Sequence, residues 1–295
     1  MIIILAIFQY LIQATVDLMD KFLISVRKIE PVSYTFYTVV TGLCLLVIWP
    51  WVFEALAVKF VVWNLLSGAL FSLAMYVFFL CLAEGEVSRV IPFIFGMVPV
   101  FDIFIAQITG RNQLTLFEIA AVCLLIPGAL LISHQQHDRW SRHLALKTLS
   151  AFLFSGYYAL WQFAAQSGPA LNNLMWNRIG AAVVLLIPLV FVSFRKKVFG
   201  LKTVKHKMST SAMFLFKQVL GGVNFVFLSM LLVVGKISVV NSLQGFRYVF
   251  VLLLAALISR HRKHILEEHI NKGALAQKAG GIALVFLGTV FLFIN

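Results

Sequence analysis

Apolar runs of roughly twenty residues, separated by short polar stretches, fill the chain from end to end. Such a run can cross the hydrocarbon core of a bilayer as a helix, which takes about 20 residues. The longest polar stretches, Ser193 to Thr210 and Ser259 to Lys272, are expected to be loops, and no segment remains for a soluble domain. The fold class is therefore predicted to be an all-α polytopic membrane protein. Ten transmembrane helices are predicted, over residues 2–22, 32–53, 61–83, 88–109, 115–133, 147–166, 171–193, 211–233, 237–258 and 276–294.

A weak internal repeat pairs the first five predicted helices with the last five. At an offset of 138 residues, Pro31, Gly42 and Pro50 meet Pro169, Gly180 and Pro188; at 150, Gly85 to Ser88 meets Gly235 to Ser238; at 160, Gly128 meets Gly288. Because five is an odd number, the second copy must enter the membrane from the opposite side. We expect two inverted five-helix repeats, residues 1–135 and 144–295, that together form one integral membrane domain.

Composition and charge agree with a membrane protein. The chain is 61% hydrophobic and only 12% charged, unlike a soluble domain. Its net charge of +13 does not indicate a nucleic-acid partner, because the basic residues gather in loops on one side. Of these, 17 Lys and Arg residues follow odd-numbered helices and three follow even-numbered ones. By the positive-inside rule, the odd connections are cytoplasmic and both termini lie outside. The cysteines Cys44, Cys81 and Cys123 lie in apolar runs and predict neither a disulfide nor a metal site.

Ionisable side chains within the predicted spans are candidates for function, because each costs at least about 2.5 kcal/mol in a bilayer. Several lie near helix ends, where snorkelling to the interface is an alternative explanation. Asp102 and Arg247 lie nearer mid-span, and the inversion places both about 4 Å from the midplane on the same side. They are predicted to pair, with separate amide or backbone partners as the alternative. The full set is Asp17, Asp20, Lys21, Asp102, Arg178, Lys217 and Arg247.

The ninth predicted helix carries a polar stripe. Asn241, Gln244, Gly245 and Tyr248 follow the spacing i, i+3, i+4 and i+7, which places them on one helix face. This stripe either lines a cavity or makes hydrogen bonds between helices, a common use of amides in membrane bundles. We predict that Gln244, Tyr248 and Arg178 face a shared cavity.

Signatures of enzymes are weak in this sequence. It has no phosphate-binding Walker loop, no GxSxG motif and no CxxC pair. The run from His264 to His269 fits neither common zinc motif and lies in a charged loop. We therefore predict no catalytic activity, no cofactor and no metal site.

Several motifs resemble those of one transporter family. They are a Lys closing the first helix (Lys21), a Pro opening the second (Pro31, echoed by Pro169), Arg178, the stretch SRVIPFIFGMVPVFDIFIAQITGR with Pro99 inside it, and PGALLIS at the end of the fifth helix. On these motifs the chain resembles the EamA-type branch of the drug/metabolite transporter superfamily.

The resemblance implies a ten-helix carrier for a small metabolite in the bacterial inner membrane, with helices 1–4 and 6–9 around a central cavity. The family is often drawn with both termini in the cytoplasm, opposite to the charge count. Taking resemblance and polar residues together, the candidate substrate-binding residues are Lys21, Asp102, Trp176, Arg178, Asn241, Gln244, Arg247 and Tyr248.

The predicted function is a secondary transporter that exports or exchanges a small solute, with or without a coupling proton or ion. A flippase for a lipid-linked head group is the alternative, since a basic rim at Arg195 to Lys197 would suit it. A membrane enzyme is the weakest hypothesis, because no nucleophile and base are evident at one depth. The expected partners are the substrate and the lipid bilayer but not nucleic acid, and the oligomeric state is left open.

Overall fold

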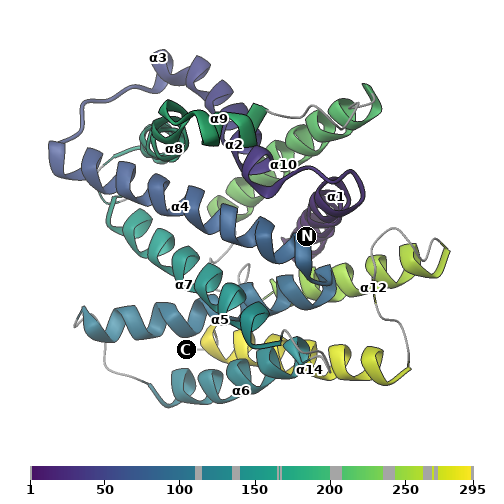
Figure 1. Cartoon of the computed structure of the whole chain (residues 1–295). Helices are drawn as coiled ribbons and strands as arrows, with labels where there is room; N and C mark the ends of the chain where they lie inside the picture. The colour runs from purple at the N-terminus through teal and green to yellow at the C-terminus, as the bar shows by residue number, and fades with distance from the viewer. Residues whose placement is uncertain are drawn as a thin grey trace. The chain divides into compact units, whose positions relative to one another are not determined.

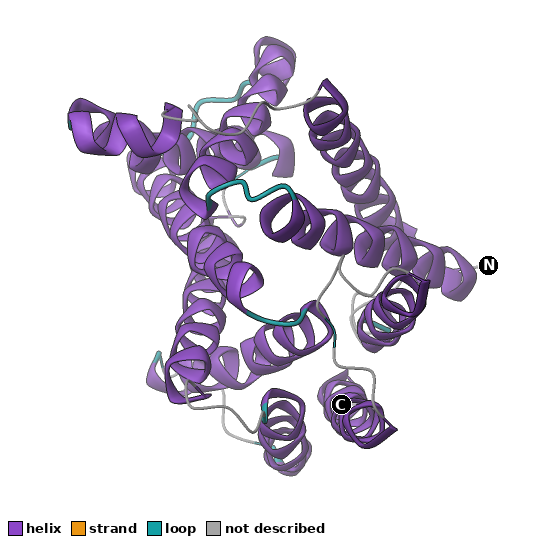
Figure 2. Cartoon of the chain, turned by 45° about the vertical axis from the view of Figure 1, so that its right-hand side comes forward, coloured by secondary structure: helices purple, strands orange, loops and turns teal. Residues whose placement is uncertain are grey.

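The computed structural model describes residues 2–109, 115–134, 140–164, 166, 168–199, 208–234, 243–261, 268 and 272–293. Over these residues the chain forms helices and no strand (Figure 1, Figure 2). The main helices are α1 (Ile2–Lys21), α2 (Pro31–Gly42), α4 (Val58–Glu84), α5 (Val87–Ile108), α6 (Leu116–Ser133), α7 (Trp140–Ala164), α8 (Ala170–Leu186), α10 (Met208–Val234), α12 (Gly245–His261) and α14 (Lys272–Phe293). Shorter helical segments are η1 (Phe22–Val26), η2 (Leu43–Ile48), α3 (Trp49–Val52), η4 (Ile187–Val190) and α9 (Val192–Phe199).

Six stretches among the described residues are long and apolar enough to cross a bilayer: Pro31–Val52, Val58–Glu84, Val87–Ile108, Leu116–Ser133, Ala170–Val190 and Gly273–Leu292. Their outward faces are apolar, with Trp51 79%, Val58 78% and Leu116 82% exposed. Apolar surface of this extent is unfavourable in water and favourable in lipid. The protein is therefore an all-helical integral membrane protein, as the sequence predicts.

Matched prolines shape two helices in the same way. Pro31 opens α2, where its fixed φ suits the first helical turn, and Pro169 directly precedes α8. Further along, α2 tightens into the 3-10 segment η2 just before Pro50, and α8 tightens into η4, which contains Pro188. Proline lacks the N–H that an α-helix would use at these positions. The repeated residues therefore coincide with a repeated break in the helix.

The chain folds into two compact units, each built from segments far apart in the sequence. Unit 1 comprises residues 1–28, 81–148 and 206–295. In it α1 packs against α10 and α12, α5 packs against α6 and α12, and α14 packs against α5, α6 and α12. Unit 2 comprises residues 29–80 and 149–205, and in it α2 packs against α8 and α9.

Small residues bring α6 and α14 together in unit 1. A Cβ atom added to Gly128 would lie 2.9 Å from the Leu284 Cβ and 3.0 Å from the Gly281 carbonyl oxygen. One added to Gly288 would lie 2.8 Å from the Leu125 Cγ. The residue numbers of the contacting positions increase along α6 as they decrease along α14, so the two helices are antiparallel. Glycine allows this close backbone approach, which is a common basis of helix association in membranes.

Polar contacts hold α4 and α7 together in unit 2. The Ser67 hydroxyl donates to the Tyr157 carbonyl oxygen at 3.3 Å, and the Ser150 hydroxyl donates to the Ala74 carbonyl oxygen at 3.4 Å. The first contact joins an early position of α4 to a late position of α7, and the second does the reverse. These two helices are also antiparallel.

One predicted loop is wrong in its first part. Val192–Phe199, expected to be mostly irregular, forms the helix α9. Phe194 and Val198, four residues apart on one helix face, pack into a cluster with Phe36 of α2, and this burial fixes the helix despite its three cations. The described part of the ninth predicted span begins at Leu243 and its helix at Gly245, and α7 begins seven residues before the predicted 147.

Candidate functional site

Two buried carboxylates on α1 bind two cations within unit 1. The Asp17 carboxylate accepts hydrogen bonds from Nε of Arg247 at 2.7 Å and from its Nη2 at 2.9 Å. Three residues further along α1, Asp20 pairs with the Lys217 ammonium at 2.7 Å. The side chains of both pairs are at most 8% exposed. Arg247 also lies over the Phe95 ring, 4.1 Å from its centroid, so α1, α5, α10 and α12 all contribute.

Amides extend this network along α1. The Gln13 amide donates to Asp17 at 3.1 Å, and the Asn224 amide donates to the Gln13 carbonyl oxygen at 2.6 Å. Gln13, Asp17 and Asp20 share one face of α1 because they are four and three residues apart. This face of α1 therefore carries a chain of hydrogen bonds from the amide pair to the Asp17–Arg247 ion pair, followed three residues later by the Asp20–Lys217 pair.

These ion pairs are sensitive to any change in one partner. Breaking a buried pair by removing one charge costs about 3–5 kcal/mol, because the other charge stays buried without compensation. A solute that supplies or withdraws charge beside them would therefore shift which pairs form. The arrangement suits a binding site whose occupancy is coupled to helix contacts.

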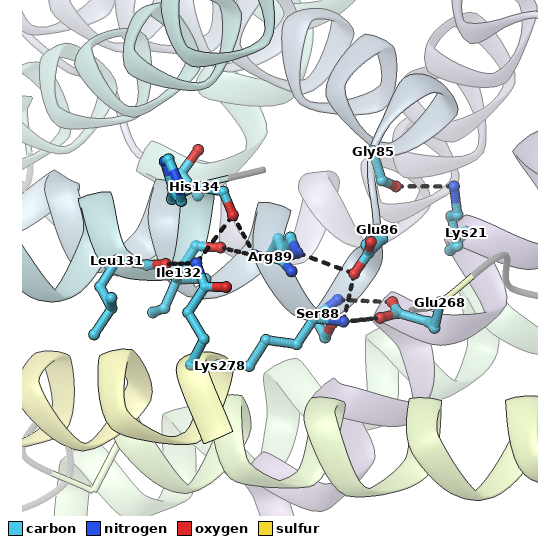
Figure 3. Close-up of polar contacts among 12 residues, drawn as sticks. Lys21, Gly85, Glu86, Ser88, Arg89, Leu131, Ile132, His134, Glu268 and Lys278 are labelled. Carbon is cyan, nitrogen blue, oxygen red and sulfur yellow. Dashed lines mark hydrogen bonds and ion pairs between the residues drawn. The ribbon is translucent and has the colours of Figure 1, made fainter. Parts of the chain in front are cut away.

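Lys21 lies at one end of unit 1 and has a different environment. Its ammonium donates to the carbonyl oxygens of Leu82 at 2.8 Å and of Gly85 at 2.9 Å, at the C-terminal end of α4 (Figure 3). Carbonyls there lack intrahelical partners, and a cation also suits the negative end of the helix dipole. Lys21, predicted as a substrate ligand, thus caps a neighbouring helix.

A second charged cluster lies at the same end. Lys278 of α14 pairs with Glu86 and, at 2.7 Å, with Glu268, while Arg89 of α5 pairs with Glu86 at 3.1 Å (Figure 3). The Glu268 carboxylate also accepts the backbone N–H and the hydroxyl of Ser88, at the start of α5.

Arg89 further donates to the carbonyl oxygens of Ile132 and His134 at the end of α6, at 2.7 and 2.8 Å. The connections after the third, fifth and ninth predicted spans therefore meet at one end of unit 1, beside the end of the first span. They belong to the set that the charge count assigns to one side of the membrane.

The candidate residues of unit 2 are on α8. Three of its asparagines make polar contacts that join helices or loops: Asn173 accepts from Asn64 at 2.8 Å, Asn177 donates to Ser67 at 3.0 Å, and Asn172 accepts from Trp49 at 3.1 Å. Trp176 packs edge-on against Trp49, with ring centroids 5.1 Å apart. Arg178 lies over the Phe71 ring, 5.2 Å from its centroid.

The other predicted site residues are only partly placed. Tyr248 is fully buried on α12 beside Arg247, and Gln244 is partly buried just before this helix. Asp102 is partly buried on α5, and its predicted pairing with Arg247 stays a prediction. Asn241 lies outside the described residues. The shared cavity of Gln244, Tyr248 and Arg178 also stays a prediction, because these residues belong to different units.

Sequence reasoning named the four charges of the α1 network but missed how they pair. The partner of Asp17 lies on another helix, since its carboxylate binds Arg247 of α12. The number of buried charges gives a signal for this pairing, since α1 offers two carboxylates, and α10 and the buried part of α12 offer one cation each.

Unit 2 contains a cavity, and the described residues contain no cluster of metal ligands. No group of three metal-ligating side chains occurs among the residues that the structure describes. An open cavity of about 420 Å³ lies in unit 2; it is lined by Trp51, Val52, Phe53, Glu54, Pro169, Ala170 and Leu171.

Comparison with known proteins adds little to this geometry. No family model and no curated protein matches the chain. A solved structure described only as "Crystal structure of protein" is similar over 99% of this chain and 94% of its own, with 14% sequence identity and a TM-score of 0.45. A likeness at this level carries no argument about function, so the reasoning below depends on the chain's own residues.

Proposed function

We propose that the protein is a secondary transporter of the EamA type in the drug/metabolite transporter superfamily. It moves a small metabolite by alternating access between two inverted five-helix repeats, residues 1–135 and 144–295, with ten membrane spans. In this proposal it resides in the bacterial inner membrane, and its basic odd-numbered connections face the cytoplasm.

The observation that carries the proposal is the contact between α6 and α14. When positions are shifted by the repeat offset of 160, the contact of Gly128 with Val285 becomes the contact of Gly288 with Leu125, and both are present. The contact of Gly128 with the Gly281 carbonyl likewise becomes that of Gly288 with the Ala121 carbonyl, which is also present. A contact that maps onto itself when its two helices are exchanged has local two-fold symmetry. Between antiparallel helices, such an axis is perpendicular to them, as inverted repeats require.

A second set of contacts follows the same rule in separate units. In unit 1, Gln13 bonds Asn224 and Asp20 bonds Lys217; in unit 2, Ser150 bonds Ala74 and Tyr157 bonds Ser67. One offset of 137 takes Gln13 to Ser150 and Asp20 to Tyr157. The offset of 150 found in the sequence takes Ala74 to Asn224 and Ser67 to Lys217. The pair α1 and α10 is thus equivalent to the pair α7 and α4.

The buried ion pairs of α1 supply the second line of support. Charged groups in membrane helices are costly and are used mainly along substrate or ion pathways. Asp17 and Arg247 sit on two of the eight helices that would surround the cavity of such a carrier. Each unit supplies a candidate substrate-binding group: this network in unit 1 and Arg178 in unit 2.

Counterflow in proteoliposomes tests the proposal. The purified protein is first screened against a metabolite library by thermal shift, because a ligand of the folded state raises the apparent stability. Compounds that stabilise it are then exchanged, labelled for unlabelled, across the bilayer, a measurement that needs no coupling ion. We expect saturable exchange, reduced at least tenfold in the charge-balanced variant Asp17→Asn/Arg247→Gln. The exposed Lys59→Gln serves as the matched control and should exchange like the wild type. Solutes that bind but exchange no faster than in empty liposomes contradict the proposal.

A further inference from the structure

Arg178, which is partly buried, differs from the buried arginines Arg89 and Arg247 in having no counter-charge within the described part of the chain. In unit 1, Arg247 binds Asp17 and Arg89 binds Glu86. The Nε of Arg178 is buried and has no hydrogen-bond partner among the described residues. Its recorded contacts there are the Phe71 ring and close packing of its side chain beside Gly42 of α2.

The sequence of unit 2 explains this lack of a counter-charge. Residues 29–80 and 149–205 contain two carboxylates, Glu30 and Glu54, and both are exposed. Each lies twelve residues from Gly42, which for the helical stretch back to Glu30 corresponds to about 18 Å. No acidic residue occurs on α8 or on residues 149–164 of α7. Arg178 therefore has no carboxylate of its own unit at pairing distance.

A buried guanidinium in a membrane protein is unfavourable without an anion. The face of Phe71 compensates only partly, because a cation–π contact stabilises by about 0.5–2 kcal/mol. The missing partner must also match a planar group with parallel N–H donors, the geometry that binds a carboxylate through two hydrogen bonds.

Arg178 lies between the backbone of α2 on one side and aromatic rings on the other. A Cβ atom built at Gly42 would lie 3.7 Å from Nη1, an ordinary contact distance, so the guanidinium lies directly beside this glycine. Phe71 packs on Tyr157, with centroids 5.2 Å apart, and Tyr157 packs on Tyr158 at 4.8 Å. One cation beside several aromatic rings fits a ligand with one negative charge and an apolar body.

We infer that Arg178 binds the carboxylate of a small organic monocarboxylate with an apolar or aromatic body, and that this is the substrate class of the protein. The inference rests on the proposed transport function, because it assigns the charge of the transported solute. A doubly charged phosphate is disfavoured, because α8 holds no second cation that could bind its second negative charge.

Matched pairs of compounds test the charge requirement. Benzoate, 3-phenylpropionate and indole-3-acetate are compared with their primary amides in thermal-shift titrations of the full chain. We expect at least one carboxylate to raise the melting temperature and its amide, which has the same body, to have no effect. Carboxylates and amides acting equally, or no carboxylate acting at all, would overturn the inference.

Substitutions locate the effect. The carboxylate-dependent shift should be lost in Arg178→Gln, weakened at least tenfold in affinity in Arg178→Lys, and kept in the control Arg195→Gln, which removes an exposed cation of the same unit. A shift that survives in Arg178→Gln refutes the assignment. If that variant does not fold, modification of wild-type Arg178 by phenylglyoxal is followed by peptide mass spectrometry. The carboxylate should slow the reaction and the amide should not, and equal rates also refute it.

The two proposals fail separately. Counterflow of a neutral or cationic solute, with no carboxylate effect, leaves the transporter standing and removes the anion assignment. A carboxylate that protects Arg178 without crossing the bilayer supports the anion assignment and contradicts the transport proposal.

Discussion

Replacing Gly128 by alanine is the most direct test of the contact between α6 and α14. The new Cβ would lie 2.9 Å from the Leu284 Cβ and 3.0 Å from the Gly281 carbonyl oxygen. Neither atom can rotate away, because one is backbone and the other is fixed to it. Overpacking of this kind costs about 1–3 kcal/mol. Alanine is also a better helix former than glycine by about 1 kcal/mol, so the net destabilisation should reach up to about 2 kcal/mol.

Gly222→Ala on α10 is the matched control for this substitution. No atom lies within 4 Å of a Cβ added at Gly222, so only the helix propensity remains and the variant should gain up to about 1 kcal/mol. The difference between the two variants isolates the overpacking term. Their unfolding free energies are measured by SDS titration of the protein in mixed micelles, followed by circular dichroism. If Gly128→Ala is as stable as Gly222→Ala, the packing argument fails.

The symmetry of the contact gives a further comparison. Gly288→Ala meets Leu125 Cγ at 2.8 Å, and that side chain can shift, so its cost should be smaller than at Gly128. The double variant Gly128→Ala/Gly288→Ala should lose less unfolding free energy than the sum of the two single losses. A single widening of the helix pair accommodates both methyl groups.

Three other outcomes follow from the described contacts. Asp17→Asn should lower the unfolding free energy by about 3–5 kcal/mol by leaving Arg247 uncompensated, and adding Arg247→Gln should restore most of it; equal losses in both variants would contradict a buried pair. Glu268→Gln should cost about 1–3 kcal/mol by weakening the bonds to Lys278 and Ser88, and the exposed Glu54→Gln should not, as denaturant titration would reveal. Single cysteines at Ser193 to Thr210 or Ser259 to Lys272, in a background without native cysteines, should resist an impermeant maleimide in intact cells and react after lysis; labelling before lysis would reverse the proposed orientation.

The helices were largely predictable because a span needs a long apolar run, and the runs stand out. The ends of the helices and the short helices were less predictable. Nothing in the charged sequence of α9 marks it as ordered, and it forms because Phe194 and Val198 find apolar partners on α2. Such contacts depend on tertiary structure, which local pattern does not contain.

The sequence could not predict which charged residues of the site pair with one another, for a related reason. The depth of Arg247 can be estimated from helical rise, but which neighbouring helix faces it depends on how each helix is rotated about its axis. Packing of α1 against α12 sets that rotation and selects Asp17. The asparagines of α8 illustrate the same limit, since the sequence does not indicate which neighbouring helix each amide contacts. Asn173 and Asn177 bond side chains of α4.

The close contact of α6 with α14 also bears on how the chain is made. Ser133 ends one helix and Lys272 begins the other, so about 140 residues are synthesised between them. At about 5–20 residues per second, α6 waits roughly 7 to 28 seconds in the membrane before its partner emerges. During that interval the groove at Gly128, with its backbone exposed, has lipid as its neighbour. Because every copy of the chain inserts α6 in the same direction, the α6 of another unfinished chain cannot supply the antiparallel partner that Gly128 needs. Completion of the last helix is thus the step that commits each chain to folding with itself.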